Sequence, residues 1–353
     1  MKSLTRGLAL SVALCATLDA MAFTDPLDQP ARLSERAVRS PLYGLAASAS
    51  THVVAVGPRG HILHSNDGGD HFLQSEVPLS SDLVSVCLVN GTLAWAVGHD
   101  SVILHSTDAG ATWTRQLDGR QLGPLAVQHY ARLPDTTSGL ERAREYAAAL
   151  AADGPTKPLF DIYFEDATHG WAVGAYNLIL YTEDGGQHWV PWMERTENPD
   201  EYSLHAIRNI AGQIYVVGEF GLLLRLERDN QRFVRLKTPY AGSFFGITGD
   251  QATLVVYGLR GNAWASNDQG STWRQLQTHT ANAINAGTLL TDGRLALATS
   301  AGELLVGDLQ GGSLQLQPRS PATPVYGLSP TASGLLIVGP DGVKRTSLEP
   351  APL

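Results

Sequence analysis

The chain has 353 residues, of which 36 are glycine and 17% are charged, and its formal net charge is −9. This length fits two average domains or one large domain built from repeats. A negative chain without a cluster of lysine and arginine is unlike a nucleic-acid-binding protein, so we expect no nucleic-acid partner. Beyond the N-terminus, no apolar stretch approaches the length of a transmembrane span, so none is expected in the mature chain.

Residues 1–22 have the pattern of a secretory signal peptide. Lys2 and Arg6 form a positive start, residues 8–18 form an apolar core, and residues 20–22 have the small-x-small pattern of a cleavage site. We therefore expect export to the periplasm or another extracytoplasmic space, with residues 23–353 as a single mature domain. Cys87 is then the one remaining cysteine, so no internal disulfide is expected.

A short apolar strand ending in Val-Gly, or a close variant, recurs along the chain. The spacings between successive copies are 41, 76, 44, 40, 41 and 40 residues, which defines seven units with one irregular interval. Each unit divides into four short strands separated by glycine-rich turns, a pattern typical of propeller blades. The sequence predicts an all-β fold, a seven-bladed β-propeller. The repeated position is occupied by Gly57, Gly98, Gly174, Gly218, Gly258, Thr299 and Gly339.

The seventh unit ends after its third strand, which would leave one sheet with an unpaired edge. Residues 31–38 precede the first unit and resemble the fourth strands of other units, such as those beginning at Phe72 and Phe233. We therefore expect an N-terminal strand to complete the seventh blade and to close the ring.

The pattern Ser/Thr-x-Asp-x-Gly-x-x-Trp/Phe occurs four times, each time between the third and fourth strands of a unit. A carboxylate can accept hydrogen bonds from turn amides, and glycine supplies the positive φ that a tight hairpin needs. The aromatic ring then packs beside the neighbouring strand. We interpret the motif as a structural staple, and we expect no metal ion and no cofactor. Its aspartates are Asp67, Asp108, Asp184 and Asp268.

Two segments depart from the repeat, one at about 118–157 between units two and three, and a smaller one at 193–201 between units three and four. Both connect the fourth strand of one unit to the first strand of the next, so both should lie on one face of the propeller. Residues 138–153 have helical periodicity, with Leu140, Ala143 and Leu150 on one side. This helical insertion either caps the propeller channel or docks a partner.

The turns between the second and third strands belong to the same face. Added loops on a rigid scaffold are where binding residues concentrate, so we predict that this face binds a partner. Its candidate residues are Arg59, His99, Asp100, Tyr176, Asn177, Glu219, Phe220, Arg260 and Asp341.

The Ser/Thr-x-Asp-x-Gly-x-x-Trp/Phe pattern resembles the Asp-box, also called the BNR repeat. Together with Trp-Ala-Val-Gly strands, as in residues 169–189, it resembles the photosystem II assembly/stability factor-like propellers over residues 40–348. The resemblance implies a non-enzymatic propeller that binds a protein partner, here an envelope membrane protein or transporter, as an assembly or accessory factor. Members of that family use a basic patch on one face. The matching face here is mixed in charge, since Arg59 and Arg260 stand beside Asp100 and Glu219.

Sialidases share the Asp-box, so a glycan-binding or sialidase-like glycoside hydrolase propeller is the alternative. Such enzymes resemble one another in an Arg-Ile-Pro segment, an arginine triad that binds a carboxylate, and a Tyr–Glu nucleophile pair. This chain has no Arg-Ile-Pro, and no Tyr–Glu pair is evident, so we expect no enzyme activity and no catalytic residue. Convergence of Arg59, Arg260 and a third arginine at the channel mouth would favour the alternative.

Overall fold

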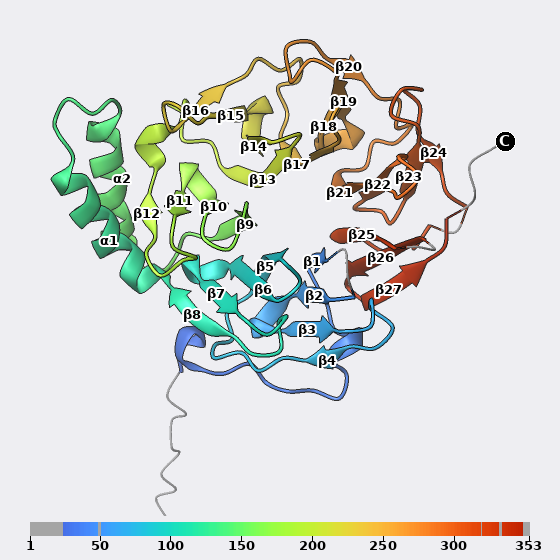
Figure 1. Cartoon of the computed structure of the whole chain (residues 1–353), viewed down its shortest axis with the longest axis horizontal. Coiled ribbons are helices and arrows are strands. Elements are labelled where there is room, and N and C mark those ends of the chain that lie inside the picture. The colour runs from blue at the N-terminus through green and yellow to red at the C-terminus, as the bar shows by residue number, and fades with distance from the viewer. Residues whose placement is uncertain (1–23, 49–50, 319, 332–333, 349–353) are drawn as a thin grey trace, which may run out of the picture.

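The computed structural model describes residues 24–348, apart from 49–50, 319 and 332–333, so the expected signal peptide lies outside the described residues. The described strands form seven antiparallel sheets that follow one another around a central opening (Figure 1). We number them sheets 1 to 7 in chain order, and they correspond in order to the seven predicted units. Sheets 1 to 6 have four strands each, and sheet 7 has three.

In each sheet the strands lie side by side in chain order. Sheet 1 consists of β1 (Gly44–Ala47), β2 (Val53–Val56), β3 (Ile62–Ser65) and β4 (Leu73–Gln74). Sheet 2 consists of β5 (Leu83–Val89), β6 (Leu93–Gly98), β7 (Ile103–Ser106) and β8 (Thr114–Leu117). Sheet 3 consists of β9 (Leu159–Phe164), β10 (Gly170–Gly174), β11 (Ile179–Thr182) and β12 (Val190–Pro191).

The second half of the chain repeats this arrangement. Sheet 4 consists of β13 (Leu204–Ile210), β14 (Gln213–Gly218), β15 (Leu223–Glu227) and β16 (Arg232–Arg235). Sheet 5 consists of β17 (Phe244–Gly249), β18 (Leu254–Gly258), β19 (Ala263–Ser266) and β20 (Arg274–Gln275). Sheet 6 consists of β21 (Ile284–Leu289), β22 (Leu295–Thr299), β23 (Leu304–Gly307) and β24 (Gln315–Leu316). Sheet 7 consists of β25 (Gly327–Thr331), β26 (Gly334–Gly339) and β27 (Gly342–Thr346).

The first strands of neighbouring sheets contact one another, and the contact between β1 and β25 closes the circuit. The second strands are almost entirely buried, as in β2, where Val53, Val54, Ala55 and Val56 are all buried. The core therefore lies between the sheets, where apolar side chains of one sheet pack on those of the next. This packing leaves the ends of the strands, and the loops that join them, as the two accessible faces.

The glycine that ends the second strand is required by a close approach of two backbone segments. In Gly98, Gly174, Gly218 and Gly258 an added Cβ would lie closer than 3.0 Å to the carbonyl oxygen of the residue before the first strand of the same sheet. The backbone of these glycines is extended. Their φ lies between −174° and −163° at Gly98, Gly174 and Gly218 and is 175° at Gly258. Lack of space, and not an unusual φ, therefore explains the repeated Val-Gly.

We expect Gly218→Ala to lower the free energy of unfolding by about 1–3 kcal/mol, because the new methyl group would collide with the Ser203 carbonyl oxygen. Gly311→Ala is the matched control, since its Cβ would meet no atom closer than 3.7 Å. Urea unfolding of both variants is the measurement. Equal stabilities would contradict the steric explanation.

The N-terminal segment closes the ring differently from our prediction. Residues 31–38 form no strand, and sheet 7 has three strands among the described residues, so the expected fourth strand is wrong. The amides of Ala37, Arg39 and Ser40 donate to carbonyl oxygens three residues earlier, in and around the turn η2 (Ala37–Arg39), and are not available for pairing with β27. The turn η2 instead packs against both β27 and β4, which places this segment across the junction of sheets 7 and 1.

The four Asp-box carboxylates are occupied by donors of their own turns. In Asp268, Oδ1 accepts from the Ser266 hydroxyl and from the Thr272 amide, each at 2.8 Å, and Oδ2 accepts from the Thr272 hydroxyl at 2.6 Å. The Ser266 hydroxyl oxygen in turn accepts from the Gly270 amide at 2.8 Å. The other three boxes repeat the bonds from the Ser or Thr hydroxyl and from the amide four residues later, at Asp67, Asp108 and Asp184.

The hydrogen bonds from Thr272 and Ser266 lower the pKa of Asp268 from 3.8 to about 2. A carboxyl group with a lowered pKa stabilises the fold above its unfolded pKa, and this stabilisation is lost as the pH falls through the folded pKa. We therefore expect Asp268→Asn to destabilise the protein most above about pH 4, with the difference from wild type shrinking toward pH 2. Urea unfolding as a function of pH is the measurement, with Asp229→Asn at an exposed turn as control. The same pH dependence in both variants would contradict this account.

Candidate functional site

The turns between the second and third strands of sheets 1 to 5 share one conformation. In each of these short 3-10 turns the middle residue has φ between 51° and 58°, although none of these residues is glycine. The left-handed region costs a residue with a side chain roughly 1–2 kcal/mol, so these tips are strained positions. The turns are η3 (Pro58–Gly60), η4 (His99–Ser101), η5 (Ala175–Asn177), η7 (Glu219–Gly221) and η8 (Leu259–Gly261), and their middle residues are Arg59, Asp100, Tyr176, Phe220 and Arg260.

Each turn is held against the link that leads to the next sheet. The amide of Gly60 donates to the Ser81 carbonyl oxygen at 2.8 Å, and the amide of Gly221 donates to the Gly242 carbonyl oxygen at 2.8 Å. At both glycines an added Cβ would collide with a carbonyl oxygen of that link. The third turn position is therefore glycine wherever a short link crosses the turn.

Sheets 2 and 3 differ at this position, and these are the sheets whose links are enlarged. Ser101 and Asn177 replace the glycine, with φ of 52° and 65°. The Ser101 hydroxyl donates to the Lys157 carbonyl oxygen at 2.5 Å, and the Asn177 side-chain amide donates to the Met193 carbonyl oxygen at 3.3 Å. Side chains thus hold the two enlarged links in place. Asn177 is buried by this role, so it lies beneath the predicted binding face and not on it.

The link between sheets 2 and 3 contains two helices, α1 (Gly119–Arg132) and α2 (Leu140–Asp153). The predicted helix at 138–153 corresponds to α2, and α1 was missed. Gly119, Gly123 and Pro124 weaken the helical pattern of α1, but Asp118 forms a capping box with Gln121, a signal that the sequence contains. Gly123 also lets α2 approach, since its Cβ would lie closer than 3.0 Å to the backbone of Ala151.

The two helices lie at the outer side of sheet 3, away from the central opening (Figure 1). Leu122 and Tyr130 of α1 and Leu150 of α2 belong to the same buried cluster as Trp192 after β12. The alternative that this insertion caps the channel is therefore wrong. Of the two helices, α2 instead forms one wall of a pocket.

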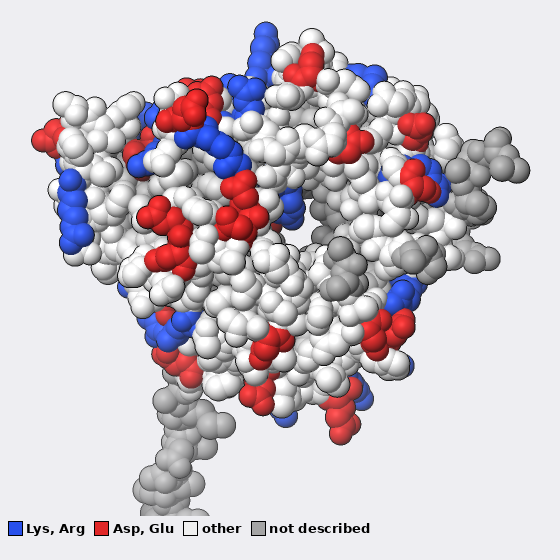
Figure 2. Space-filling view, viewed as in Figure 1, with Lys and Arg blue, Asp and Glu red and all other residues white. Residues whose placement is uncertain are grey.

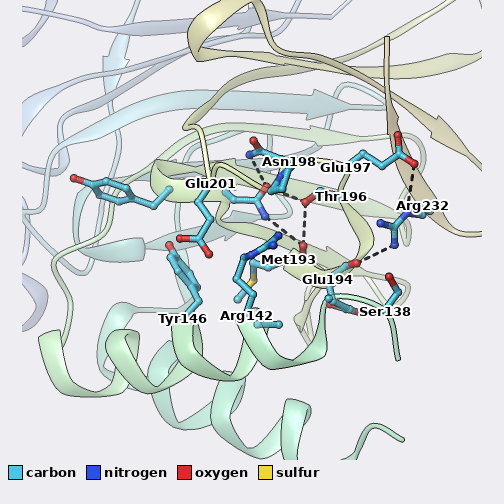
Figure 3. Close-up of a pocket in the computed structure, with 15 residues that line it drawn as sticks. Ser138, Arg142, Tyr146, Met193, Glu194, Thr196, Glu197, Asn198, Glu201 and Arg232 are labelled. Carbon is cyan, nitrogen blue, oxygen red and sulfur yellow. Dashed lines mark hydrogen bonds and ion pairs between the residues drawn. The ribbon is translucent and has the colours of Figure 1, made fainter. Parts of the chain in front are cut away.

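That pocket, which we call the insertion pocket, has a volume of about 360 Å³. It lies between α2, the turn η5 and residues 193–201, which include the turn η6 (Met193–Arg195) (Figure 3). Its floor is a hydrogen-bonded polar network, in which the Asn177 side-chain oxygen accepts from Thr196 at 3.0 Å and from Asn198 at 2.9 Å. These side chains are satisfied by one another, so the floor is a rigid support.

A buried carboxylate, Glu194, anchors the same floor to α1. The Tyr130 hydroxyl donates to Glu194 Oε2 at 3.0 Å and accepts from the Met193 amide at 3.1 Å. Arg195 Nε donates to Glu194 Oε1 at 3.1 Å. Burial and the neighbouring Glu194 charge raise the pKa of Tyr130 well above its usual range, so this hydroxyl remains a donor.

Three side chains face one another across the pocket opening. Arg142 and Tyr146 point from α2 into the pocket, and Glu201 faces them from the opposite side (Figure 3). Burial raises the pKa of the Glu201 carboxyl, while the Arg142 charge opposes that shift. Arg142 makes no hydrogen bond or ion pair with another described residue, so its guanidinium is available to a ligand. Arg142, Tyr146, Glu194 and Glu201 were absent from the predicted site.

An exposed aromatic ridge runs beside the insertion pocket, formed by Tyr176, Tyr202 and Phe220. Tyr176 and Phe220 are 56% and 60% exposed. The rings of Tyr202 and Phe220 lie 4.9 Å apart, and Lys157 Nζ lies 5.1 Å from the centre of the Tyr176 ring. Large apolar side chains at strained turn tips are costly for a free monomer, so this ridge is a candidate contact surface.

The remaining predicted residues are not gathered into one site. Glu219 accepts from the Ser203 amide at 2.7 Å, Asp100 accepts from Ser81 at 2.6 Å, and Asp341 pairs with Lys344 at 2.7 Å. These carboxylates therefore hold loops. Arg59, His99 and Arg260 belong to sheets 1, 2 and 5, and are exposed.

The central opening contains one arginine among its described lining residues, Arg208, so Arg59 and Arg260 do not converge there. The condition that would favour a sialidase-like site is therefore not met. Figure 2 shows acidic side chains gathered beside the opening, over sheets 3 and 4, with basic side chains interspersed. Lysine and arginine side chains form no continuous patch on the described surface that Figure 2 shows.

We expect Tyr130→Phe to lower the free energy of unfolding by about 1–3 kcal/mol, because it removes a donor to the buried Glu194 and an acceptor for the Met193 amide. Tyr176→Phe removes an exposed hydroxyl that makes no hydrogen bond among the described residues, and it is the control. Urea unfolding is the measurement. A loss of less than about 0.5 kcal/mol for Tyr130→Phe would show that the floor does not depend on this hydroxyl.

The profile of the family described as photosynthesis system II assembly factor YCF48 matches residues 29–129 and 152–307. The chain belongs to this family. The expected resemblance is thereby confirmed. The matched residues leave out 130–151, which contain most of α2, so one wall of the insertion pocket lies outside the family pattern.

Curated relatives match in part. The chain is 31% identical over 143 residues to a photosystem II assembly lipoprotein Ycf48 of Synechococcus sp. (strain CC9902), an alignment that covers 38% of this chain and 41% of the relative. It is 25% identical over 147 residues to the chloroplastic photosystem II stability/assembly factor HCF136 of Oryza sativa subsp. japonica, covering 39% of this chain and 35% of the relative. The chain thus spans about two fifths of the relatives' length.

Solved structures are similar over nearly the whole chain. A structure of YCF48 bound to D1 peptide has a TM-score of 0.64 at 16% identity, covering 91% of this chain and 97% of that one. YCF48 from Cyanidioschyzon merolae has a TM-score of 0.61 at 16% identity, covering 89% and 97%. The WD40 beta propeller domain of Doa1 also has a TM-score of 0.61, at 12% identity, covering 91% and 95%. The fold is therefore that of a β-propeller.

Proposed function

We propose that this chain is an exported, non-enzymatic, seven-bladed propeller that binds a protein partner and acts as an assembly or accessory factor for an envelope membrane complex. Family membership supports a protein-binding assembly factor, and a similar solved structure holds a peptide named D1. The pattern of residues 1–22 supports export. Among the described residues, no helix has the length and apolar character needed to cross a bilayer.

The observation that carries this proposal is the insertion pocket beside the aromatic ridge. Interfaces depend on aromatic and arginine side chains that bury fully when the partner binds. Tyr176 and Phe220 supply exposed rings, and Arg142 supplies a guanidinium at the pocket opening that makes no hydrogen bond or ion pair within the described part of the chain. The pocket floor is already satisfied and rigid, so little ordering is needed when a partner docks.

In this proposal, the identity of the partner is determined by the part of the pocket that lies outside the residues matched by the family profile. The scaffold that holds Tyr176 and Asn177 lies within the matched residues, whereas Arg142 and Tyr146 of α2 fall in the unmatched stretch. We infer that the family scaffold presents a common binding face and that α2 adapts it to an envelope client, such as a membrane protein or transporter, different from a photosystem subunit.

We expect Phe220→Asp to reduce recovery of the partner by about tenfold or more in crosslinked co-purification of the tagged protein from native envelopes, because it removes an aromatic anchor. Leu316→Asp is the matched control, since this side chain is 57% exposed and lies in sheet 6, outside the residues of the pocket and the ridge. Equal recovery by Phe220→Asp and the control, with both variants folded, would contradict the proposed binding face.

A further inference from the structure

Each of the seven sheets contributes to the central opening one residue that lies at or beside the start of its first strand. Five of these seven residues have an aromatic or imidazole ring. In sheets 2 to 6 the residue is the extra one of a β-bulge, where the register of the first and second strands shifts. A β-bulge re-aims a side chain and is frequent beside binding sites. We call this set the collar, and it consists of Tyr43, Val84, Phe160, His205, Phe245, Asn285 and Tyr326.

The residue that follows each collar residue is small in six of the seven sheets, which leaves room within the opening. The resulting cavity has a volume of about 190 Å³, and Figure 2 shows the opening as a hollow. The exception is Asp161 of sheet 3, which introduces a carboxylate into an otherwise small and uncharged ring. The small residues are Gly44, Ser85, Ala206, Gly246, Ala286 and Gly327.

Asp161 holds Arg208 of sheet 4 in a fixed orientation. Its carboxylate is buried and accepts from the Ser85 hydroxyl at 2.6 Å, from the Ile207 amide at 2.8 Å, and from Arg208 Nη1. Arg208 Nη1 also donates to the Ile207 carbonyl oxygen at 2.6 Å. Both hydrogen bonds of this guanidinium within the described chain therefore leave from Nη1, and its Nε and Nη2 donors remain unused.

Arg208 is accessible from the cavity, since 43% of its side chain is exposed. A guanidinium whose orientation is fixed on one side can bind a carboxylate with its remaining donors. Apart from Asp161, which is already paired, the described lining of the cavity holds no other carboxylate to occupy those donors. Among the described lining residues, the Nε and Nη2 donors of Arg208 are therefore available to an anion that enters from solvent.

A second donor, Tyr257, reaches the same cavity through gaps left by two glycines. A Cβ on Gly246 would collide with the Tyr257 hydroxyl, and a Cβ on Gly287 would lie 2.6 Å from its ring. Burial raises the pKa of Tyr257 to about 12, against the opposing charge of Arg208, so the hydroxyl is protonated at neutral pH. His205 Nδ1 lies 2.8 Å from the Phe244 carbonyl oxygen, which fixes one ring of the collar.

We propose that the central opening binds a carboxylate, with Arg208 and Tyr257 as its donors and the collar rings packed around the attached apolar group. The carboxylate belongs either to a small organic acid or to a terminus or side chain of a polypeptide. The cavity shares no lining residue with the insertion pocket, so this site is independent of the proposed partner face. Asp161 and Ser85 act as positioning residues that orient the guanidinium.

Isothermal titration of the mature protein with benzoate and with benzamide tests the requirement for a carboxylate. We expect saturable benzoate binding at millimolar ligand, and about tenfold or greater weakening with benzamide or with Arg208→Gln. Arg294→Gln is the matched control, because Arg294 pairs with Asp292 in a turn of sheet 6 and is not among the lining residues of the cavity. Tyr257→Phe is a second variant that keeps the Asp161–Arg208 pair, and we expect severalfold weaker benzoate binding.

A second arm distinguishes the two sources of the carboxylate. A short peptide with a free C-terminus is compared with its amidated form and tested for competition with benzoate. Stronger binding of the free peptide than of benzoate indicates a polypeptide, and binding of benzoate without the peptide indicates a small acid. The proposal is overturned if benzoate and benzamide bind equally, if Arg208→Gln and Tyr257→Phe leave benzoate affinity unchanged, or if neither benzoate nor the free peptide binds.

Discussion

The rest of the structure depends on one contact. In each sheet this contact joins the turn between the second and third strands to the link that leads to the next sheet. In sheets 1 and 4 the amide of the turn glycine donates to a carbonyl oxygen of the link, and in sheets 1, 4 and 5 the turn glycine leaves no room for a side chain between turn and link. In sheets 2 and 3 the side chains of Ser101 and Asn177 make the contact instead, so in sheets 1 to 5 the link is held against the turn. The N-terminal segment meets sheet 7 in the same way, because the Val38 carbonyl oxygen lies against Gly342. The ring is thus closed by a link and not by a fourth strand.

The same constraint explains where new structure could be added. A link can grow only if its contact with the turn is replaced, and Ser101 and Asn177 make that replacement with side-chain hydrogen bonds. The enlarged links then build the insertion pocket at the outer side of sheet 3, whereas the first strands independently build the cavity at the centre. The proposed binding face and the central opening are therefore separate features of one repeated scaffold.

Much of the fold could be predicted from the sequence, because the Val-Gly glycines and the Asp-box recur wherever the backbone geometry recurs. The way in which the ring closes could not be predicted, because residues 31–38 have the composition of a strand. Only the local hydrogen bonds of Ala37 and Arg39 show that the end of this segment forms a turn. Of the candidate site, Tyr176 and Phe220 were predicted from the topology to lie at strand 2–3 turns, and the structure places them there. Arg142 and Glu201 were missed because their proximity depends on how α2 packs on residues 193–201, which no local sequence pattern encodes. Arg208 and Asp161 were missed because β-bulges change which residues line the opening.

The most direct test of the central claim, that a membrane-protein partner docks at the aromatic ridge, is site-specific photocrosslinking in native envelopes. A photoreactive amino acid replaces Tyr176 in one variant and exposed Leu316 in another. The account predicts that position 176 crosslinks to one membrane protein and that position 316 does not. Crosslinks to that protein from position 316 alone, or from both positions equally, would contradict it.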